Sequence, residues 1–231
     1  MGVVASTVRS SCCVDKTGTG IEERFPTEAA PDSVRRLRKE LPQKPIICIL
    51  GGTSFSKPDT QETVEALADA VSDRVGHRAV FMTGGMVGVQ QAFAESCPRS
   101  LSLFHLTPFG EDSKFTVGLD VHAGVNLPER KDVYGLLGDL YITIEGGPGV
   151  AGEAKAAAAR GAAVIPLIRS GGASSGMFDF PESSLQKPDW ALEGQWSMLS
   201  KEEASPKEVA NAIALLVECY LQAQRQPATP P

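Results

Sequence analysis

Three glycine-containing segments are the parts of this sequence best suited to bind a ligand, because each directly follows an apolar run. Glycine there permits a positive φ and close approach of a ligand, and a helix that follows presents unpaired N–H groups with a partial positive charge. Phosphate suits such a turn. One glycine pair can end a strand for steric reasons alone, whereas three together indicate a phosphate site. The segments are Gly51-Gly52-Thr53-Ser54, Gly84-Gly85-Met86-Val87-Gly88 and Glu145-Gly146-Gly147-Pro148-Gly149.

The elements that carry these turns follow from hydrophobic periodicity. Continuous apolar runs are typical of strands buried on both faces of a parallel sheet, and apolar residues three and four positions apart predict helices between them. We expect strands at residues 46–50, 79–83, 101–106, 120–126, 139–144 and 162–168, and helices at residues 34–41, 59–75, 87–95, 129–137, 150–160 and 205–224. This alternation predicts an α/β fold with a doubly wound, mostly parallel Rossmann-like sheet and helices on both faces. Ligands of such folds bind at the C-terminal ends of the strands, where the three turns lie.

The chain is predicted to form one Rossmann-like domain over residues 31–225. Residues 1–30 are rich in Ser, Thr, Gly and Pro without periodicity, and we expect them to be a flexible leader. Residues 226–231 are expected to be a flexible tail. Hydrophobic residues make up 42% of the chain and charged residues 22%, which fits a globular protein able to bury a core.

The third turn belongs to a longer motif. It comprises Glu129-Arg130-Lys131, then Gly138-Asp139 before a strand, then Glu145-Gly146-Gly147-Pro148-Gly149-Val150-Ala151-Gly152-Glu153. These residues resemble the signature of the LOG family, often labelled lysine decarboxylase-like, which has an Arg-Lys pair followed by Pro-Gly-Gly-x-Gly-Thr-x-x-Glu. The resemblance covers residues 45–168. It implies cleavage of the N-glycosidic bond of a nucleoside 5′-monophosphate, such as a cytokinin ribotide, to free base and ribose 5-phosphate.

The resemblance implies a role for each matching residue. Arg130 matches the family's catalytic Arg and Glu153 its catalytic Glu, while Gly146, Gly147 and Gly149 match its phosphate loop. The chemistry agrees, because a carboxylate can stabilise the oxocarbenium-like state of a breaking ribosyl bond and an Arg can hold phosphate or ribose oxygens. The other residues expected to bind the phosphate or nucleotide are Gly51, Gly52, Thr53, Ser54, Lys57, Gly84, Gly85, Gly88, Lys131 and Val150.

Two positions depart from the family's motif. Val150 replaces a Thr whose hydroxyl could bond phosphate, and Glu145 replaces a Pro and brings a carboxylate to the anion site. Lys57 or Lys131 could offset that charge; alternatively, Glu145 points away, or the ligand differs from a simple monophosphate. Retention of Arg130 and Glu153 favours an enzyme, a nucleoside-monophosphate phosphoribohydrolase that binds AMP or a related nucleotide. The altered loop favours the alternative, a non-catalytic nucleotide-binding or sensing domain tethered to a membrane.

Composition argues against other classes of protein. A net charge of −6 with scattered basic residues disfavours a nucleic-acid partner. An NAD(P)-dependent oxidoreductase is disfavoured because no GxGxxG follows the first strand and no acidic residue closes the second. The Cys and His residues match no metal-binding spacing, so we expect neither a metal nor a cofactor. The odd number of cysteines favours a reduced, cytoplasmic setting, and a homodimer is compatible with the sequence.

The first residues fit a lipidation pattern. The segment from Met1 to Ser6 matches an N-myristoylation motif with Gly2 as the acceptor, and Cys12 and Cys13 could carry palmitate. One acyl chain anchors weakly, and a second signal makes attachment persistent. In a eukaryote we therefore expect a cytoplasmic protein attached to the membrane surface through this segment. The alternative is a chance match in a flexible leader.

Overall fold

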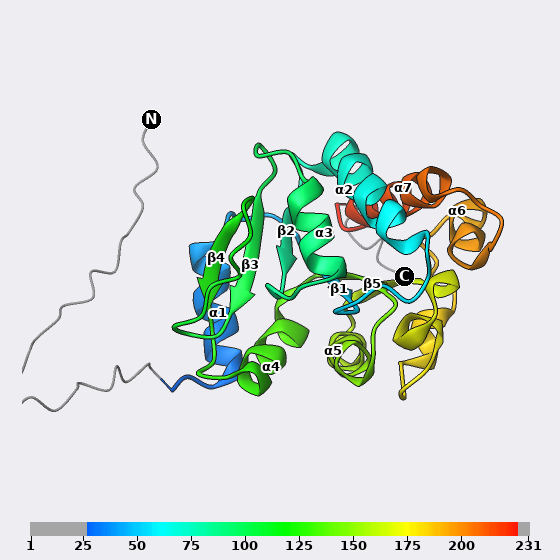
Figure 1. Ribbon diagram of the computed structural model, residues 1–231. Helices are drawn as coiled ribbons and strands as arrows, with labels where there is room; N and C mark the ends of the chain where they lie inside the picture. The colour runs from blue at the N-terminus through cyan, green and yellow to red at the C-terminus, as the bar shows by residue number, and fades with distance from the viewer. Residues whose placement is uncertain (1–26, 226–231) are drawn as a thin grey trace, which may run out of the picture.

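The computed structural model describes residues 27–225. They form a six-stranded, all-parallel sheet covered by helices (Figure 1). The strand order is β4-β3-β2-β1-β5-β6. The strands are β1 (Ile46–Gly51), β2 (Val80–Thr83), β3 (Leu103–Thr107), β4 (Leu119–His122), β5 (Leu140–Ile144) and β6 (Ala163–Leu167). The predicted α/β fold with a doubly wound, Rossmann-like sheet is thus confirmed. The predicted lipidation residues Gly2, Cys12 and Cys13 lie outside the described residues.

The strand order places a switch point between β1 and β5. From β1 the chain builds outward through β2, β3 and β4, and it then returns along α4 to start β5 on the other side of β1. The loops that follow β1 and β5 therefore diverge at this point, and ligands of open α/β sheets bind in the resulting crevice. Both loops carry glycine turns singled out in the sequence.

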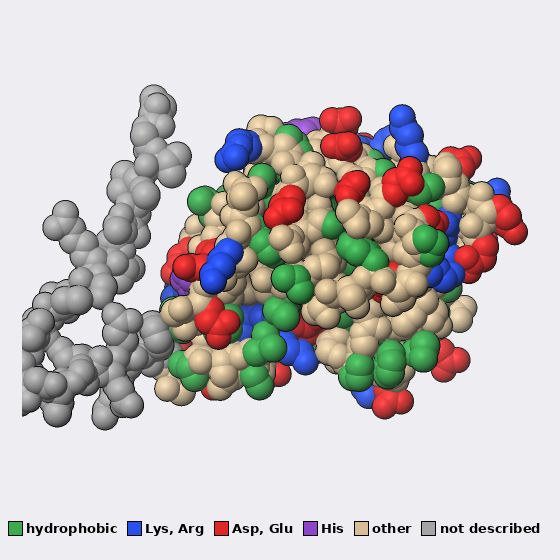
Figure 2. Space-filling view, in the orientation of Figure 1, with side chains coloured by type: hydrophobic (Ala, Val, Ile, Leu, Met, Phe, Trp, Pro, Cys, Tyr) green, Lys and Arg blue, Asp and Glu red, His purple; other side chains and the backbone are tan. Residues whose placement is uncertain are grey.

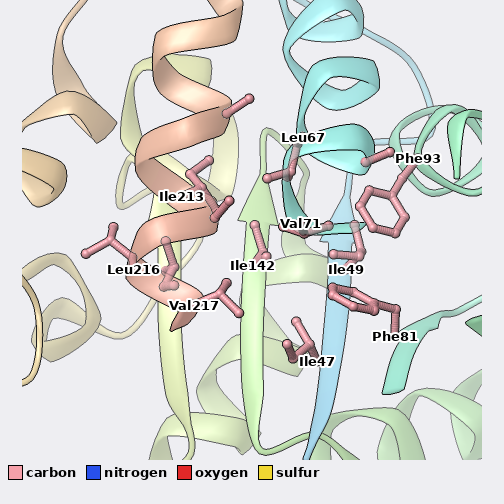
Figure 3. Close-up of a cluster of buried hydrophobic side chains, with 14 of the residues drawn as sticks. Ile47, Ile49, Leu67, Val71, Phe81, Phe93, Ile142, Ile213, Leu216 and Val217 are labelled. Atoms are coloured by element: carbon pink, nitrogen blue, oxygen red, sulfur yellow. The ribbon is translucent and has the colours of Figure 1, made fainter. Parts of the chain in front are cut away.

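Two hydrophobic clusters hold helices to opposite faces of the sheet. In β1, Ile47 and Ile49 face one cluster while Cys48 and Leu50 face the other, as the alternation of side chains along a strand requires. The first cluster includes side chains of α2 (Thr60–Val75), α3 (Val89–Ser96) and α7 (Pro206–Ala223), which Figure 3 shows packed on the strands. The second includes α1 (Ala30–Glu40), α4 (Leu127–Leu137) and α5 (Pro148–Ala159). Burial on both faces explains why the strands read as continuous apolar runs.

Some boundaries differ from those expected. The strand expected at residues 120–126 is Leu119–His122 and pairs in parallel with β3, although residues 108–118 between the two strands hold no helix. The helix expected from residue 129 begins at Leu127, because Asn126 caps it. No strand or helix was expected between residues 168 and 205, where the structure has α6 (Glu193–Ser197) and the 3₁₀ turns η1 (Ile168–Ser170), η2 (Gly172–Ser175), η3 (Glu182–Leu185) and η4 (Met198–Ser200). Among the described residues, no helix is both long and apolar enough to cross a membrane.

Candidate functional site

The loops after β1 and β5 are joined by the carboxylate of Glu145. This residue is buried, and its φ of 53° lies in the left-handed region. Its carboxylate accepts the backbone N–H of Ser56 at 2.8 Å and that of Lys57 at 3.1 Å, both in the loop after β1. Its own N–H donates to Oγ of Ser170 at 2.7 Å. Glu145 is therefore a structural clamp whose carboxylate is occupied by the first loop, in agreement with the alternative that it points away from the anion site.

A pocket of about 210 Å³ lies between the ends of these strands and the first turns of α4 and α5. It brings together most of the residues that the sequence singled out, including both proposed catalytic residues. The pocket is lined by Gly51, Gly52, Thr53, Met86, Gln90, Leu127, Arg130, Lys131, Gly147, Gly149, Val150 and Glu153.

Three residues of this wall were missed by sequence reasoning. Met86 belongs to the second glycine turn, Gln90 is a buried side chain of α3, and Leu127 is a half-exposed residue that opens α4. A single Gln within a helical pattern carries no sequence signal of its own. The offset of Leu127 and Arg130 by three residues, which places them on one helix face, is a signal that could have identified Leu127.

Arg130 and Glu153 form an ion pair inside the pocket wall. Nη1 of Arg130 lies 3.1 Å from Oε1 of Glu153, and the two residues are 2% and 7% exposed. Asn126 positions Arg130 in the first turn of α4, because its side chain accepts the N–H of Glu129 at 2.9 Å and so starts the helix there. Burial raises the pKa of Glu153 to about 7, against the opposing charges of Arg130 and Lys131. Arg130 is thus a buried partner of Glu153, not a surface helix residue.

The guanidinium of Arg130 is confined by its neighbours. On one side, a Cβ at Gly84 would lie only 2.7 Å from Nη1. On another side, the guanidinium carbon lies 5.6 Å from the ring centre of Tyr134, within cation–π range. Nε of Arg130 is buried and has no hydrogen-bond partner among residues 27–225. The orientation of the Arg130 guanidinium is therefore set by its packing against Gly84 and Tyr134 and by its ion pair with Glu153.

The opposite side of the pocket has the features of an anion site. Gly147 is the N-cap of α5 and Pro148 occupies its first turn, but no side chain in the described part of the chain caps this helix end. The amides there therefore keep their partial positive charge. The ammonium of Lys131 lies beside this helix end, because its Nζ is 3.3 Å from the place where a Cβ would stand on Gly149. An uncapped helix end beside an ammonium suits a phosphate group.

The predicted glycines serve different purposes in the three turns. A Cβ on Gly147 would meet no atom within 4 Å and its φ is −114°, so neither packing nor backbone geometry demands glycine there. A Cβ on Gly146, by contrast, would collide with the side chain of Val150, and its φ is 91°. In the first turn, a Cβ on Gly51 would collide with Val89. The structure therefore leaves open space at position 147, whereas packing accounts for the glycines at positions 51 and 146.

The second glycine turn makes its hydrogen bonds and packing contacts within the protein. The N–H groups of Gly84 and Met86 donate to Oε1 of Gln90, and that of Gly85 donates to Oγ1 of Thr83. The N–H at the start of α3 donates to the carbonyl of the first turn, and a Cβ on Gly88 would collide with the same turn. These contacts explain the glycines by packing. Phosphate binding at this turn stays a prediction.

Several predicted site residues lie outside the pocket wall. They are Ser54, Lys57, Gly84, Gly85, Gly88 and Gly146. The ammonium of Lys57 lies 3.0 Å from the carboxylate of Glu202 at the surface, so Lys57 meets Glu145 through its backbone alone.

On the face in Figure 2, acidic and basic side chains are interspersed and no broad basic patch is seen.

Comparison with known proteins places the fold. No family model and no curated protein sequence matches the chain. A solved structure of the molybdenum cofactor carrier protein from Chlamydomonas reinhardtii is similar, with 16% identity and a TM-score of 0.50 over 76% of this chain and 99% of that chain. The molybdenum cofactor binding protein from Rippkaea orientalis has 19% identity and a TM-score of 0.49, covering 75% and 98%. The X-ray structure of TM1055 has 21% identity and a TM-score of 0.48, covering 56% and 78%. The likeness to the Chlamydomonas structure agrees with the Rossmann-like α/β fold of this chain.

Proposed function

We propose that the chain is a nucleotide-binding hydrolase of the LOG type, which cleaves the N-glycosidic bond of a nucleoside 5′-monophosphate to free base and ribose 5-phosphate. One observation carries the proposal. The buried pair of Arg130 and Glu153 shares a pocket with the uncapped end of α5 and with Lys131. A nucleoside monophosphate needs such a combination, because its phosphate and its reactive ribose carbon lie a few bonds apart.

The phosphate would bind at the start of α5. The first-turn amides of Gly149 and Val150 and the ammonium of Lys131 would supply donors of hydrogen bonds and positive charge. Gly147, which has open space where a side chain would be, allows the phosphate to approach the backbone. This placement uses the third of the three turns found in the sequence.

Glu153 would act on the ribose. As the N-glycosidic bond breaks, its electron pair leaves with the base and positive charge develops on the anomeric carbon. The ionised carboxylate of Glu153 stabilises that charge and positions the water that attacks, and the proton of the water passes to solvent or to the departing base. Arg130 fixes the carboxylate from the protein side through Nη1. A carboxyl with a pKa of about 7 can hold and release a proton near neutral pH.

A second candidate function is nucleotide binding without turnover, as in a sensor or a carrier. Val150 supports it, because this residue presents methyl groups to the pocket where the LOG motif has a hydroxyl, and it is buried against Gly146. The Chlamydomonas protein of similar fold is described as a cofactor carrier. In either function, the ligand would bind through its phosphate at the start of α5.

Release of free base separates the two functions. A panel of nucleoside 5′-monophosphates, beginning with AMP, is incubated with the full chain, and free base is followed by chromatography. Glu153→Gln should lower release by on the order of a hundredfold or more while nucleotide binding changes little. The matched control is Glu203→Gln, which makes the same change at an exposed position. No release by the wild type from any nucleotide would favour the sensor, and undiminished release by Glu153→Gln would remove Glu153 from the mechanism.

The predicted membrane attachment is a separate part of the proposal. It rests on Gly2, Cys12 and Cys13 in the sequence alone. In eukaryotic cells, Gly2→Ala should shift the protein from the membrane fraction to the cytosol. A wild-type chain found wholly in the cytosolic fraction would contradict the lipid anchor and leave the pocket unaffected.

A further inference from the structure

Gln90 is a buried polar side chain that the proposed reaction does not use. It lies in the first turn of α3, is 3% exposed and forms part of the pocket wall. Its Oε1 accepts the N–H of Gly84 at 2.7 Å and the N–H of Met86 at 3.2 Å. Two donors at one end of the amide fix its orientation, because only the oxygen can accept them.

The other end of the Gln90 amide has no partner in the described part of the chain. Nε2 of Gln90 has no hydrogen-bond partner within residues 27–225, yet the buried unpaired side-chain nitrogens of that range are the Nε atoms of Arg78 and Arg130 alone. Nε2 is therefore accessible, and the pocket is open space that Gln90 lines. The protein thus holds an oriented N–H donor at this wall, supported by two backbone groups. A donor left unpaired there loses hydrogen-bond energy that a ligand oxygen can restore.

The guanidinium of Arg130 lies beside the same turn. Gly84 is contacted from one side by Oε1 of Gln90 and from the other by the guanidinium, whose Nη1 and Nη2 lie 2.7 Å and 3.2 Å from a Cβ placed on this glycine. Among the described groups, Nη2 of Arg130 also has no partner and is not one of the buried unpaired atoms. Gln90 and Arg130, which both contact Gly84, therefore each hold an unpaired donor, and the pocket wall that they share has a single carboxylate, that of Glu153.

We propose that Gln90 is a ligand-positioning residue, whose Nε2 donates a hydrogen bond to an oxygen of a sugar phosphate while Oε1 remains bound to the second glycine turn. The assignment rests on the proposed function for the location of the ligand, and it adds a residue that the LOG motif did not point to. The oxygen belongs either to the ribose or to the phosphate, and both are acceptors.

The test is the substitution Gln90→Glu, which has nearly the same shape. A carboxylate still accepts the N–H groups of Gly84 and Met86, so the thermal unfolding temperature should match or exceed that of the wild type. The end that faces the pocket, however, changes from a donor to a negatively charged acceptor. Affinity for ribose 5-phosphate, measured by calorimetry, should fall by about tenfold or more, because a negatively charged acceptor that repels the anionic ligand replaces a donor. The control is Gln91→Glu, which adds the same charge one residue along α3 outside the pocket wall and should change affinity by about twofold or less.

The ligand panel contains ribose 5-phosphate and inorganic phosphate. A loss confined to ribose 5-phosphate assigns the contact to the ribose, and an equal loss for both assigns it to the phosphate. The proposal is overturned if the wild type binds neither probe, if Gln90→Glu binds ribose 5-phosphate as tightly as the wild type, or if both variants lose affinity equally. Because the readout is binding, failure of the wild type to release base from any nucleotide would refute the hydrolase proposal and leave this assignment standing.

Discussion

Gly84 and Arg130 are in direct contact, and the absence of a side chain at position 84 is what makes room for the guanidinium. A Cβ there would lie 2.7 Å from Nη1 and 3.1 Å from the guanidinium carbon. The same Nη1 holds the carboxylate of Glu153. The second glycine turn thus helps to fix the position of Arg130, the buried cation of the pocket wall.

Gly84→Ala should therefore displace Arg130 and weaken its bond to Glu153. We expect a loss of about 1–3 kcal/mol in the free energy of unfolding, as for other overpacked buried sites. Binding of ribose 5-phosphate should weaken in parallel. Chemical denaturation and calorimetry measure the two effects. The control is Gly152→Ala, where a Cβ meets no atom within 4 Å and replacing a helical glycine should raise stability by about 1 kcal/mol. Equal stability changes in the two variants would show that Arg130 is free to move.

Gly146 and Gly147 provide a second contrast between packing and ligand binding. Gly147→Ser should raise the free energy of unfolding by about 0.5 kcal/mol or less, because serine is a good N-cap and its side chain has space. The same hydroxyl would occupy the approach to the α5 amides, so phosphate affinity should fall. Gly146→Ser should instead destabilise the fold, since its φ is 91° and its Cβ would strike Val150. If Gly147→Ser leaves phosphate affinity unchanged, the anion site is not at the start of α5.

The contrast also shows what the sequence could and could not predict. Arg130, Lys131, Gly147, Gly149 and Glu153 belong to one motif within residues 129–153, and the structure brings all of them to one pocket. The glycine turns were all interpreted as ligand sites, because a glycine required by packing and one required by a ligand look the same in a sequence. Only the tertiary contacts of each glycine separate the two.

Two polar residues illustrate the same limit. The sequence places Glu145 beside an anion site, but the direction of its side chain depends on the backbone N–H groups of the loop after β1. Gln90 has a place in the pocket only because the second turn closes on its Oε1. The role of Glu145 depends on hydrogen bonds to a distant loop, and that of Gln90 on hydrogen bonds to the turn before its helix. Local periodicity encodes neither set of bonds. Strands and helices, in contrast, were predicted well because burial on two faces leaves a local pattern.

Glu145→Gln should loosen the clamp between the two loops. An amide has one acceptor oxygen in place of two, so one of the N–H groups of Ser56 and Lys57 loses its partner. We expect a loss of about 1–3 kcal/mol in the free energy of unfolding, which chemical denaturation measures against the exposed control Glu203→Gln. Base release or ligand affinity should change less than in Glu153→Gln, because the Glu145 carboxylate is bound outside the pocket wall. A catalytic loss as large as that of Glu153→Gln would place Glu145 in the reaction.

The raised pKa of Glu153 predicts opposite effects of pH on stability and on activity. Burial raises this pKa from 4.5 to about 7. Between these two values the folded chain binds a proton that the unfolded chain has released, so the contribution of Glu153 to the free energy of unfolding falls as pH rises through that window. Gln at position 153 does not titrate. The stability of the wild type relative to Glu153→Gln should therefore decrease as pH rises from 4.5 to 7 and stay constant above it.

The rate of base release should depend on the fraction of Glu153 that is ionised. If Glu153 stabilises a developing positive charge, kcat/KM for base release rises by about tenfold per pH unit below pH 7 and levels off above it. Denaturation curves and initial rates, both collected at intervals from pH 4.5 to 9, give the two profiles on one preparation. Adding Glu203→Gln to the series corrects for the loss of one ordinary carboxylate. A rate that is flat across pH 7 while the stability difference titrates there would show that Glu153 is buried and proton-binding but takes no part in the chemical step.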